Sequence, residues 1–204
     1  MQTPQQPPTR KGELRVEIET LLDDACARGM RLCLLRGGDF FGEGGASTWA
    51  SFMLGKALNG GKITWPTALS TRHQFAYLPD FAQTHAALLA KRETLPARAI
   101  FHFEGHVVDG HTFVRASAEA LGDLHRKSAS LPWWGLQLAG LFSAKMREVA
   151  QMRYLWDEEV LMSQRTLQTV LPEPPKTDLV DALRRELATQ RGEVVVSGSR
   201  TAAA

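Results

Sequence analysis

The spacing of apolar residues near the start of the chain predicts a helix followed by a buried strand. Leu14, Ile18 and Leu21 recur at helical intervals in a segment whose other positions are mostly charged. Gly29 then provides a helix stop. The run Arg31–Arg36 is apolar except at its ends, which favours a short parallel strand buried on both faces. A helix that leads into such a strand is half of a crossover unit, so the pattern indicates an α/β fold.

Further along the chain the pattern predicts one more buried strand, at Ala99–Phe103, and a short extended segment at Phe75–Leu78. Helices are expected at Ser47–Leu58, Pro79–Lys91, Thr112–Leu121, Pro132–Tyr154, Thr166–Leu171 and Asp178–Gln190. Two convincing buried strands are too few for a self-sufficient doubly wound sheet. We therefore expect that strands which pair with them are missing from this sequence.

Composition and charge are those of a globular protein without a polyanionic partner. Of the 204 residues, 44% are hydrophobic and 23% are charged, which excludes a disordered chain. The net charge of +2 arises from basic residues spread along the chain, so neither nucleic acid nor a membrane is expected as a partner. Met1–Arg10 lacks the apolar stretch of a signal peptide. We expect a cytoplasmic protein in which Cys26 and Cys33 are reduced, small buried residues.

Four short segments carry a resemblance to a known family. They are Pro8–Arg15, Arg36–Gly42, His73–Ala82 and Phe101–Gly105. In this order they resemble the C-terminal part of extended short-chain dehydrogenases, the NAD(P)-dependent epimerase/dehydratase family. Arg-Gly-Gly-Asp-Phe-Phe-Gly is similar to the family's loop Arg-x-x-Asn-x-Tyr-Gly-Pro. His-Gln-Phe-Ala-Tyr-Leu-Pro-Asp-Phe-Ala is similar to its segment Arg-Asp-Phe-x-Tyr-Val-x-Asp-Val-Ala.

The resemblance implies the C-terminal part of a doubly wound, Rossmann-like sheet, joined to a smaller and mostly helical substrate-binding portion. We place this domain at residues 13–190, after a polar segment at 1–12 and before a flexible tail at 191–204. The resemblance also implies NAD or NADP as cofactor and, in the full-length parent, a small-molecule substrate. The residue that selects between the two dinucleotides would lie ahead of residue 1.

The family's cofactor fingerprint is not found in this sequence. The G-x-G-x-x-G motif joins a first strand to a helix whose N-terminus holds the pyrophosphate. The glycine cluster Gly37–Gly45 lacks that spacing, and the resemblance makes it a loop on the substrate side. We therefore expect a fragment that is inactive alone. An interaction subunit that completes its sheet with a partner chain is the alternative, followed by a small enzyme that uses Lys11 or a histidine.

The family's catalytic tyrosine and lysine are also replaced. Alignment on Gly12 puts Lys11 at the tyrosine position and Arg15 at the lysine position. An arginine cannot lose its proton in a protein, and a lysine with an ordinary pKa of about 10.4 is a poor proton relay at neutral pH. We favour the interpretation that both are solvated residues on the first turns of a helix.

The resemblance places the substrate and cofactor side on one loop and one further residue. The loop consists of Arg36, Gly37, Gly38, Asp39, Phe40, Phe41 and Gly42, and the further residue is His73. Asp39 and the two phenylalanines either line a substrate pocket or belong to a loop whose rings fill the core. His73 stands where sugar-nucleotide members carry an arginine, which argues against a sugar-nucleotide substrate. It reads equally well as a surface residue.

Other residues support no catalytic or metal site. His102, His106 and His111 are spaced so that three imidazoles do not share one face, so no metal is expected. Asp80 is expected to complement the helix dipole. The apolar positions after Pro132, namely Trp133, Trp134, Leu136, Leu138, Leu141 and Phe142, form either core or a partner-binding face. Because strands are missing, uncovered apolar surface favours self-association or a partner chain.

Overall fold

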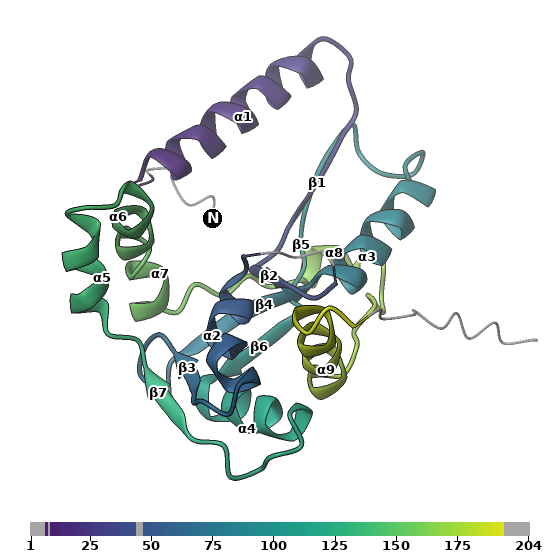
Figure 1. Cartoon of the computed structure of the whole chain (residues 1–204). Helices are drawn as coiled ribbons and strands as arrows, with labels where there is room; N and C mark the ends of the chain where they lie inside the picture. The colour runs from purple at the N-terminus through teal and green to yellow at the C-terminus, as the bar shows by residue number, and fades with distance from the viewer. Residues whose placement is uncertain (1–6, 8, 44–46, 194–204) are drawn as a thin grey trace, which may run out of the picture.

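The computed structural model describes residue 7 and residues 9–43 and 47–193. Within these ranges the chain forms nine helices and seven short strands arranged in three small sheets (Figure 1). The expected α/β class is therefore confirmed. Gly44 and Gly45 of the glycine cluster, and most of the segments 1–12 and 191–204, lie outside or at the edge of the described residues.

The N-terminal crossover unit forms as expected, but it is far less buried. Helix α1 (Arg10–Ala27) leads into β1 (Leu32–Arg36), which pairs in parallel with β5 (Arg98–His102). No residue of α1 is buried, and Leu35 alone is buried in β1. The expectation of a strand buried on both faces is thus wrong, because the described chain packs little against this end of the sheet (Figure 1).

The centre of the molecule is a three-stranded sheet that the sequence only partly predicts. Its order is β2 (Asp39–Phe41), β4 (Arg72–Tyr77) and β6 (His106–Asp109). Strands β2 and β4 run parallel, and β4 and β6 run antiparallel. Helix α3 (Leu78–Ala90) begins directly after β4, with a proline in its first turn. Strands of three or four residues are too short to show a periodicity of two, which is why β2 and β6 were not expected.

The main core lies between this sheet and the helices α2 (Trp49–Leu58), α4 (Gly110–Ala120) and α9 (Leu179–Gln190). A third sheet, formed by β3 (Ile63–Trp65) and the parallel β7 (Ser128–Ser130), borders it. The large, fully buried side chains of this core are Phe41, Met53, Leu54, Ile63, Trp65, Phe75, Tyr77, Phe113 and Trp156. Helix α8 (Arg165–Gln168) packs with β5 in a second cluster around Leu167.

The single long helix expected at Pro132–Tyr154 is wrong. The structure has α5 (Trp133–Gly140), α6 (Ala144–Gln151) and α7 (Tyr154–Asp157) in its place. The chain turns after α5, and Ser143 caps α6 by accepting a hydrogen bond from the Met146 amide. A Cβ on Gly140 would lie 3.0 Å from the Arg147 Cα, so the two helices pack closely against each other. We call α5, the turn and α6 the helical hairpin.

The two cysteines are more exposed than expected. Cys33 is exposed and Cys26 is partly exposed, so the expectation of two buried cysteines is wrong. Cys33 lies on the poorly covered β1, which accounts for its exposure. No described helix combines the length and the apolar character that crossing a membrane requires.

Candidate functional site

The loop Arg36–Gly42 carries the chain from the end of β1 into β2, alongside β4. Its glycines are required by close approach to β4. A Cβ on Gly38 would lie 2.2 Å from the Gln74 carbonyl oxygen, and one on Gly37 would lie 3.2 Å from the Ala76 Cβ. Gly42 has a φ of +108°, which favours glycine. The loop therefore sits on β4 with no room for larger side chains at these positions.

Asp39 and His73 form a polar pair at the beginning of the two parallel strands. The His73 Nε2 atom lies 2.7 Å from the Asp39 Oδ2 atom. The imidazole also stacks on the Trp156 indole, with ring centroids 3.8 Å apart and planes inclined by 9°. The His73 side chain is 12% exposed and that of Asp39 is 30% exposed. His73 is therefore held on two sides rather than free at the surface.

The two phenylalanines of the loop have different environments. Phe41 is 1% exposed and packs against Phe75 and Tyr77, as the core-filling alternative expects. Phe40 is 37% exposed and makes an edge contact with Phe81 of α3. Of the two rings, only Phe40 is available to a bound ligand.

Arg36, at the start of the loop, forms an ion pair with helix α1. Its guanidinium donates to both carboxylate oxygens of Glu19 on α1, each at 2.6 Å. A second ion pair, between Arg98 on β5 and Asp23 on α1, has an N···O distance of 2.6 Å. Together they fasten α1 to the β1–β5 sheet by charge, because α1 has no buried residue.

Sequence reasoning missed the residues that hold the other end of the loop. The Gly42 amide donates to the Glu186 carboxylate of α9 at 2.7 Å, and Glu186 is only 1% exposed. Burial raises the pKa of Glu186 above its ordinary value of 4.5. The Tyr77 hydroxyl donates to Glu43 at 2.5 Å, and burial followed by this carboxylate raises the pKa of Tyr77, which stays protonated. Contacts between residues so far apart in sequence leave no local signal.

Two more buried side chains, one on β4 and one on α3, connect the elements around His73 to distant parts of the chain. Gln74 donates to the Glu104 carbonyl at 2.8 Å and accepts from the Met162 amide at 2.7 Å. Asp80 lies in the first turn of α3 as expected, but its carboxylate accepts from the amide and hydroxyl of Thr177 at 2.6 and 2.7 Å. Asp80 therefore ties α3 to the segment that leads into α9, rather than capping its own helix.

The three histidines considered above do not come together. His106 is buried, and burial lowers its pKa, so it is neutral near pH 7. Partial burial followed by the charge of Arg36 lowers the pKa of His102. In the part of the chain that the structure describes, no group of three His, Cys, Asp or Glu side chains is placed to hold a metal ion.

Lys11 and Arg15 lie apart from the loop. Both are exposed on the first turns of α1, and the Lys11 ammonium pairs with Glu148 of α6 at 3.3 Å. Figure 1 shows the start of α1 beside α6, away from β2 and β4. The structure thus brings Asp39 and His73 together. Lys11 and Arg15, which align with the family's tyrosine and lysine, lie elsewhere.

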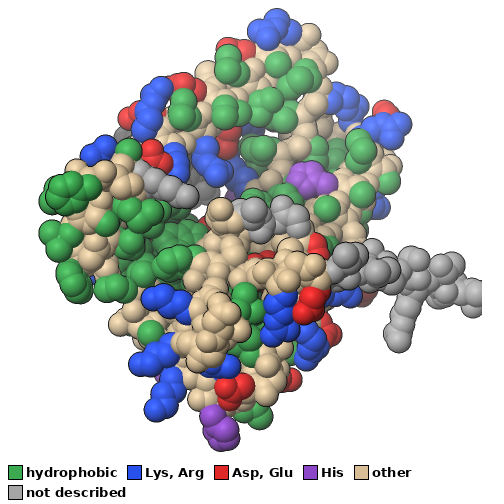
Figure 2. Space-filling view, viewed as in Figure 1, with side chains coloured by type: hydrophobic (Ala, Val, Ile, Leu, Met, Phe, Trp, Pro, Cys, Tyr) green, Lys and Arg blue, Asp and Glu red, His purple; other side chains and the backbone are tan. Residues whose placement is uncertain are grey.

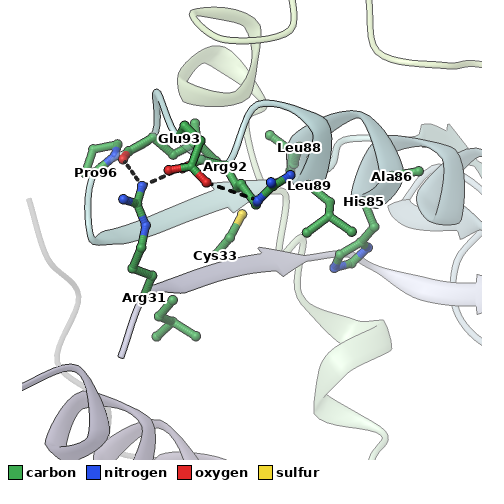
Figure 3. Close-up of a pocket in the computed structure, with 11 residues that line it drawn as sticks. Arg31, Cys33, His85, Ala86, Leu88, Leu89, Arg92, Glu93 and Pro96 are labelled. Atoms are coloured by element: carbon green, nitrogen blue, oxygen red, sulfur yellow. Dashed lines mark hydrogen bonds and ion pairs between the residues drawn. The ribbon is translucent and has the colours of Figure 1, made fainter. Parts of the chain in front are cut away.

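A hollow of about 560 Å³ lies between the start of β1 and α3. Figure 3 shows Cys33 and His85 on its two sides, with Arg31 reaching across to the turn after α3. The Arg31 guanidinium donates to the Leu95 carbonyl at 2.8 Å. The Cys33 residue is exposed, but the surrounding chain desolvates its thiol enough to raise the pKa, which argues against a nucleophilic cysteine. Neither Asp39 nor His73 lines this hollow, so it lies apart from the candidate loop.

Comparison with solved structures identifies the architecture. The UDP-glucuronic acid 4-epimerase of Bacillus cereus, solved with UDP-glucuronic acid and NAD, matches with a TM-score of 0.69 at 13% identity, over 92% of this chain and 54% of that one. The dTDP-glucose 4,6-dehydratase of Bacillus anthracis, solved with NAD, matches with a TM-score of 0.66 at 11% identity, over 94% and 55%. The chain has the fold of these epimerases and dehydratases.

A third structure with this fold, the UDP-N-acetylglucosamine 4-epimerase of Bacillus cereus, gives a TM-score of 0.67 at 12% identity, over 94% of this chain and 57% of that one. No protein-family model matches the sequence, and no curated protein matches it in sequence. The expected fold of the extended short-chain dehydrogenases is confirmed. The chain spans about half the length of the solved structures it matches.

Proposed function

We propose that this chain supplies the substrate-binding side of an NAD(P)-dependent epimerase, dehydratase or reductase of the extended short-chain dehydrogenase family. On this proposal the dinucleotide, NAD or NADP, is bound mainly by polypeptide outside this sequence. The observation that carries the proposal is the fold match, which takes in nearly all of this chain but about half of each relative. The missing glycine-rich fingerprint supports the same division.

Within this proposal, Asp39, His73 and Phe40 face the substrate or the nicotinamide. Asp39 and Phe40 are the first two residues of β2, on the loop that glycines hold close to β4, and His73 is the second residue of the parallel strand β4. Asp39 and His73 form a polar pair in which the Oδ2 and Nε2 atoms lie 2.7 Å apart. Phe40, the residue after Asp39, adds an exposed aromatic ring. Lys11 and Arg15 have no part in the chemistry that we propose.

The coding sequence immediately upstream of residue 1 tests this proposal. We expect it to encode, in frame, a strand, a glycine-rich turn with the G-x-G-x-x-G spacing and a helix. The longer product should bind NADH, whereas the 204-residue chain should not. Saturable binding of NADH by the chain alone would contradict the proposed division.

A second candidate function is an interaction subunit that completes its sheet with a separately encoded chain. The observation that favours it is the apolar stripe of α1, on which Leu14, Ile18 and Leu21 are 42%, 55% and 66% exposed. Strand β1 also pairs with β5 alone in the described part of the chain. A purified chain that is monomeric and unfolds in one cooperative transition would count against this alternative.

A further inference from the structure

The hollow between the start of β1 and α3 is an apolar space that the fold leaves unfilled. Its volume of about 560 Å³ falls within the roughly 300–1,000 Å³ of pockets that hold small organic ligands. The buried Leu88 and Leu95 line it from α3 and from the turn after α3, and Leu32 lines it from β1. Leu89 also lines it and is 66% exposed, so it lies at the rim. An apolar ligand would therefore gain free energy by leaving water for this space.

Arg31 gives one wall of the hollow a positive charge. The Nη2 atom of its guanidinium donates to the carbonyls of Arg92 and Leu95, the latter at 2.8 Å, so the turn after α3 holds the group in place (Figure 3). Both acceptors are uncharged. In the part of the chain that the structure describes, no carboxylate pairs with Arg31, and its Nε and Nη1 donors have no partner. A guanidinium that is fixed in position and has unused donors is suited to binding a carboxylate.

The other charged side chains of the hollow do not cancel the charge of Arg31. Among the described residues that line it, Glu93 carries the single carboxylate, and this pairs with the Arg92 guanidinium at an N···O distance of 3.2 Å. His85 faces the hollow from α3 and adds a second positive charge when it is protonated (Figure 3). Figure 2 shows hydrophobic and basic side chains next to one another around β1 and α3. The hollow thus combines an apolar interior with a positive rim, a combination that favours an anion with an apolar body.

We propose that this hollow binds a small organic anion with an apolar body, such as a medium-chain carboxylate. The carboxylate accepts hydrogen bonds from Arg31, and the hydrocarbon part lies against the leucines that line the hollow. The bound ligand covers part of β1, which the described chain leaves poorly buried. The inference does not rest on the proposed enzymatic function, because neither Asp39 nor His73 lines the hollow.

Cys33 reports whether the hollow is occupied, because this exposed residue is part of its lining. Alkylation of the whole 204-residue chain with N-ethylmaleimide, followed by mass spectrometry, gives separate rates for Cys33 and Cys26. Cys26 lies on α1, does not line the hollow and serves as the internal control. Saturating sodium decanoate should slow the alkylation of Cys33 about tenfold or more by blocking access to the thiol, and it should leave the rate of Cys26 unchanged.

Two further probes with the same hydrocarbon chain test the choice of charge. Decanol is uncharged, and decyltrimethylammonium is a cation. Half-maximal protection of Cys33 should need about tenfold more decanol than decanoate, because decanol loses the charged hydrogen bonds to Arg31. Decyltrimethylammonium should protect Cys33 least, because the guanidinium repels it.

Substitutions of Leu89 separate the effect of charge from the effect of apolar area. Leu89→Asp and Leu89→Lys remove the same side chain from the rim and add opposite charges. Because Leu89 is 66% exposed, both variants should keep the fold, which circular dichroism checks. Leu89→Asp should bind decanoate at least about tenfold more weakly than Leu89→Lys. Leu124→Asp makes the same acidic change at a position that is 71% exposed after α4, and it should leave binding unchanged.

Three results would overturn the proposal. The first is an unchanged rate of alkylation of Cys33 at about millimolar decanoate, the weakest affinity that a specific site is expected to show. The second is stronger protection by decyltrimethylammonium than by decanoate, or equal binding of decanoate by Leu89→Asp and Leu89→Lys, either of which would show that charge does not select the ligand. The third is a longer product of the gene in which Cys33 is shielded without added ligand, which would assign the hollow to polypeptide.

Discussion

Glu186 places a carboxylate in the core at the end of the candidate loop. It accepts from the Gly42 amide at 2.7 Å and from Gln190 at 2.8 Å, yet desolvation dominates and raises its pKa. Because the folded chain binds this proton more tightly than the unfolded chain, ionisation of Glu186 lowers stability. Stability from this group is present below its ordinary pKa of 4.5 and is lost as the pH rises through the folded value.

Glu186→Gln should remove this pH dependence. The amide oxygen of glutamine can still accept from Gly42, and it does not ionise. We expect the free energy of unfolding of the wild type, relative to that of the variant, to fall as the pH rises from 4.5. Urea denaturation of both proteins between about pH 4.5 and pH 8 measures the difference in their free energies of unfolding. Groups that titrate alike in both proteins cancel in this difference. A difference that is constant with pH would contradict the raised pKa.

His73→Ala should destabilise the chain by about 2 kcal/mol. The change removes a stacked ring from Trp156 and leaves the Asp39 carboxylate without its imidazole partner. His125→Ala, at an exposed position after α4, is the matched control and should change stability by less than about 0.5 kcal/mol. Equal effects of the two substitutions in urea denaturation would show that the contacts of His73 contribute nothing to stability.

At the scale of elements, patterns local in sequence were predictable and contacts distant in sequence were not. The helices α1, α3, α4 and α9 follow from periodicity, proline and glycine, and β1 and β5 follow from short apolar runs. The strands β2 and β6 are too short to show a pattern. The break after Gly140 was missed because Leu141 and Phe142 continue the apolar run through the turn. The motif resemblance located Asp39 and His73, but Trp156 and Glu186 joined the site only through the fold.

The hairpin offers a pair of glycines that should respond in opposite ways. Gly140→Val places a branched side chain where the Arg147 Cα would be 3.0 Å from the new Cβ, and it should cost about 1–3 kcal/mol. Gly135→Ala lies in the same helix with no atom within 4 Å, and it should stabilise the chain by about 0.5–1 kcal/mol. Thermal unfolding of both variants measures this. A stable Gly140→Val protein would contradict the close packing of α5 on α6.

Asp80 joins two elements through its hydrogen bonds to Thr177. Asp80→Ala removes a buried carboxylate and leaves two donors of the partly buried Thr177 unpaired, so it should cost about 1–3 kcal/mol. Asp80→Asn keeps one oxygen acceptor and should cost less. Hydrogen exchange should show the loss of protection concentrated at the starts of α3 and α9. Loss spread evenly over the molecule would contradict a local tie.

At the scale of the whole molecule, burial divides the chain into two regions. The sheet β2–β4–β6 and the helices α2, α4 and α9 enclose a packed core around Trp65, Phe75 and Trp156. In contrast, α1 has no buried residue and is held to the β1–β5 sheet by two ion pairs. Exposed or partly exposed ion pairs contribute little to stability, so α1 with its exposed apolar stripe is the least firmly packed helix of this region. This contrast agrees with a chain that spans about half of its structural relatives.

Calorimetric titration of the purified chain with NADH, and separately with NADPH, tests the central claim most directly. The claim is that the chain carries the substrate side of the fold and depends on other polypeptide for its dinucleotide. It predicts no saturable heat with either dinucleotide up to millimolar concentration, which corresponds to a binding free energy weaker than about −4 kcal/mol. A one-to-one isotherm with a micromolar Kd would contradict the claim and show that these 204 residues hold a cofactor site of their own.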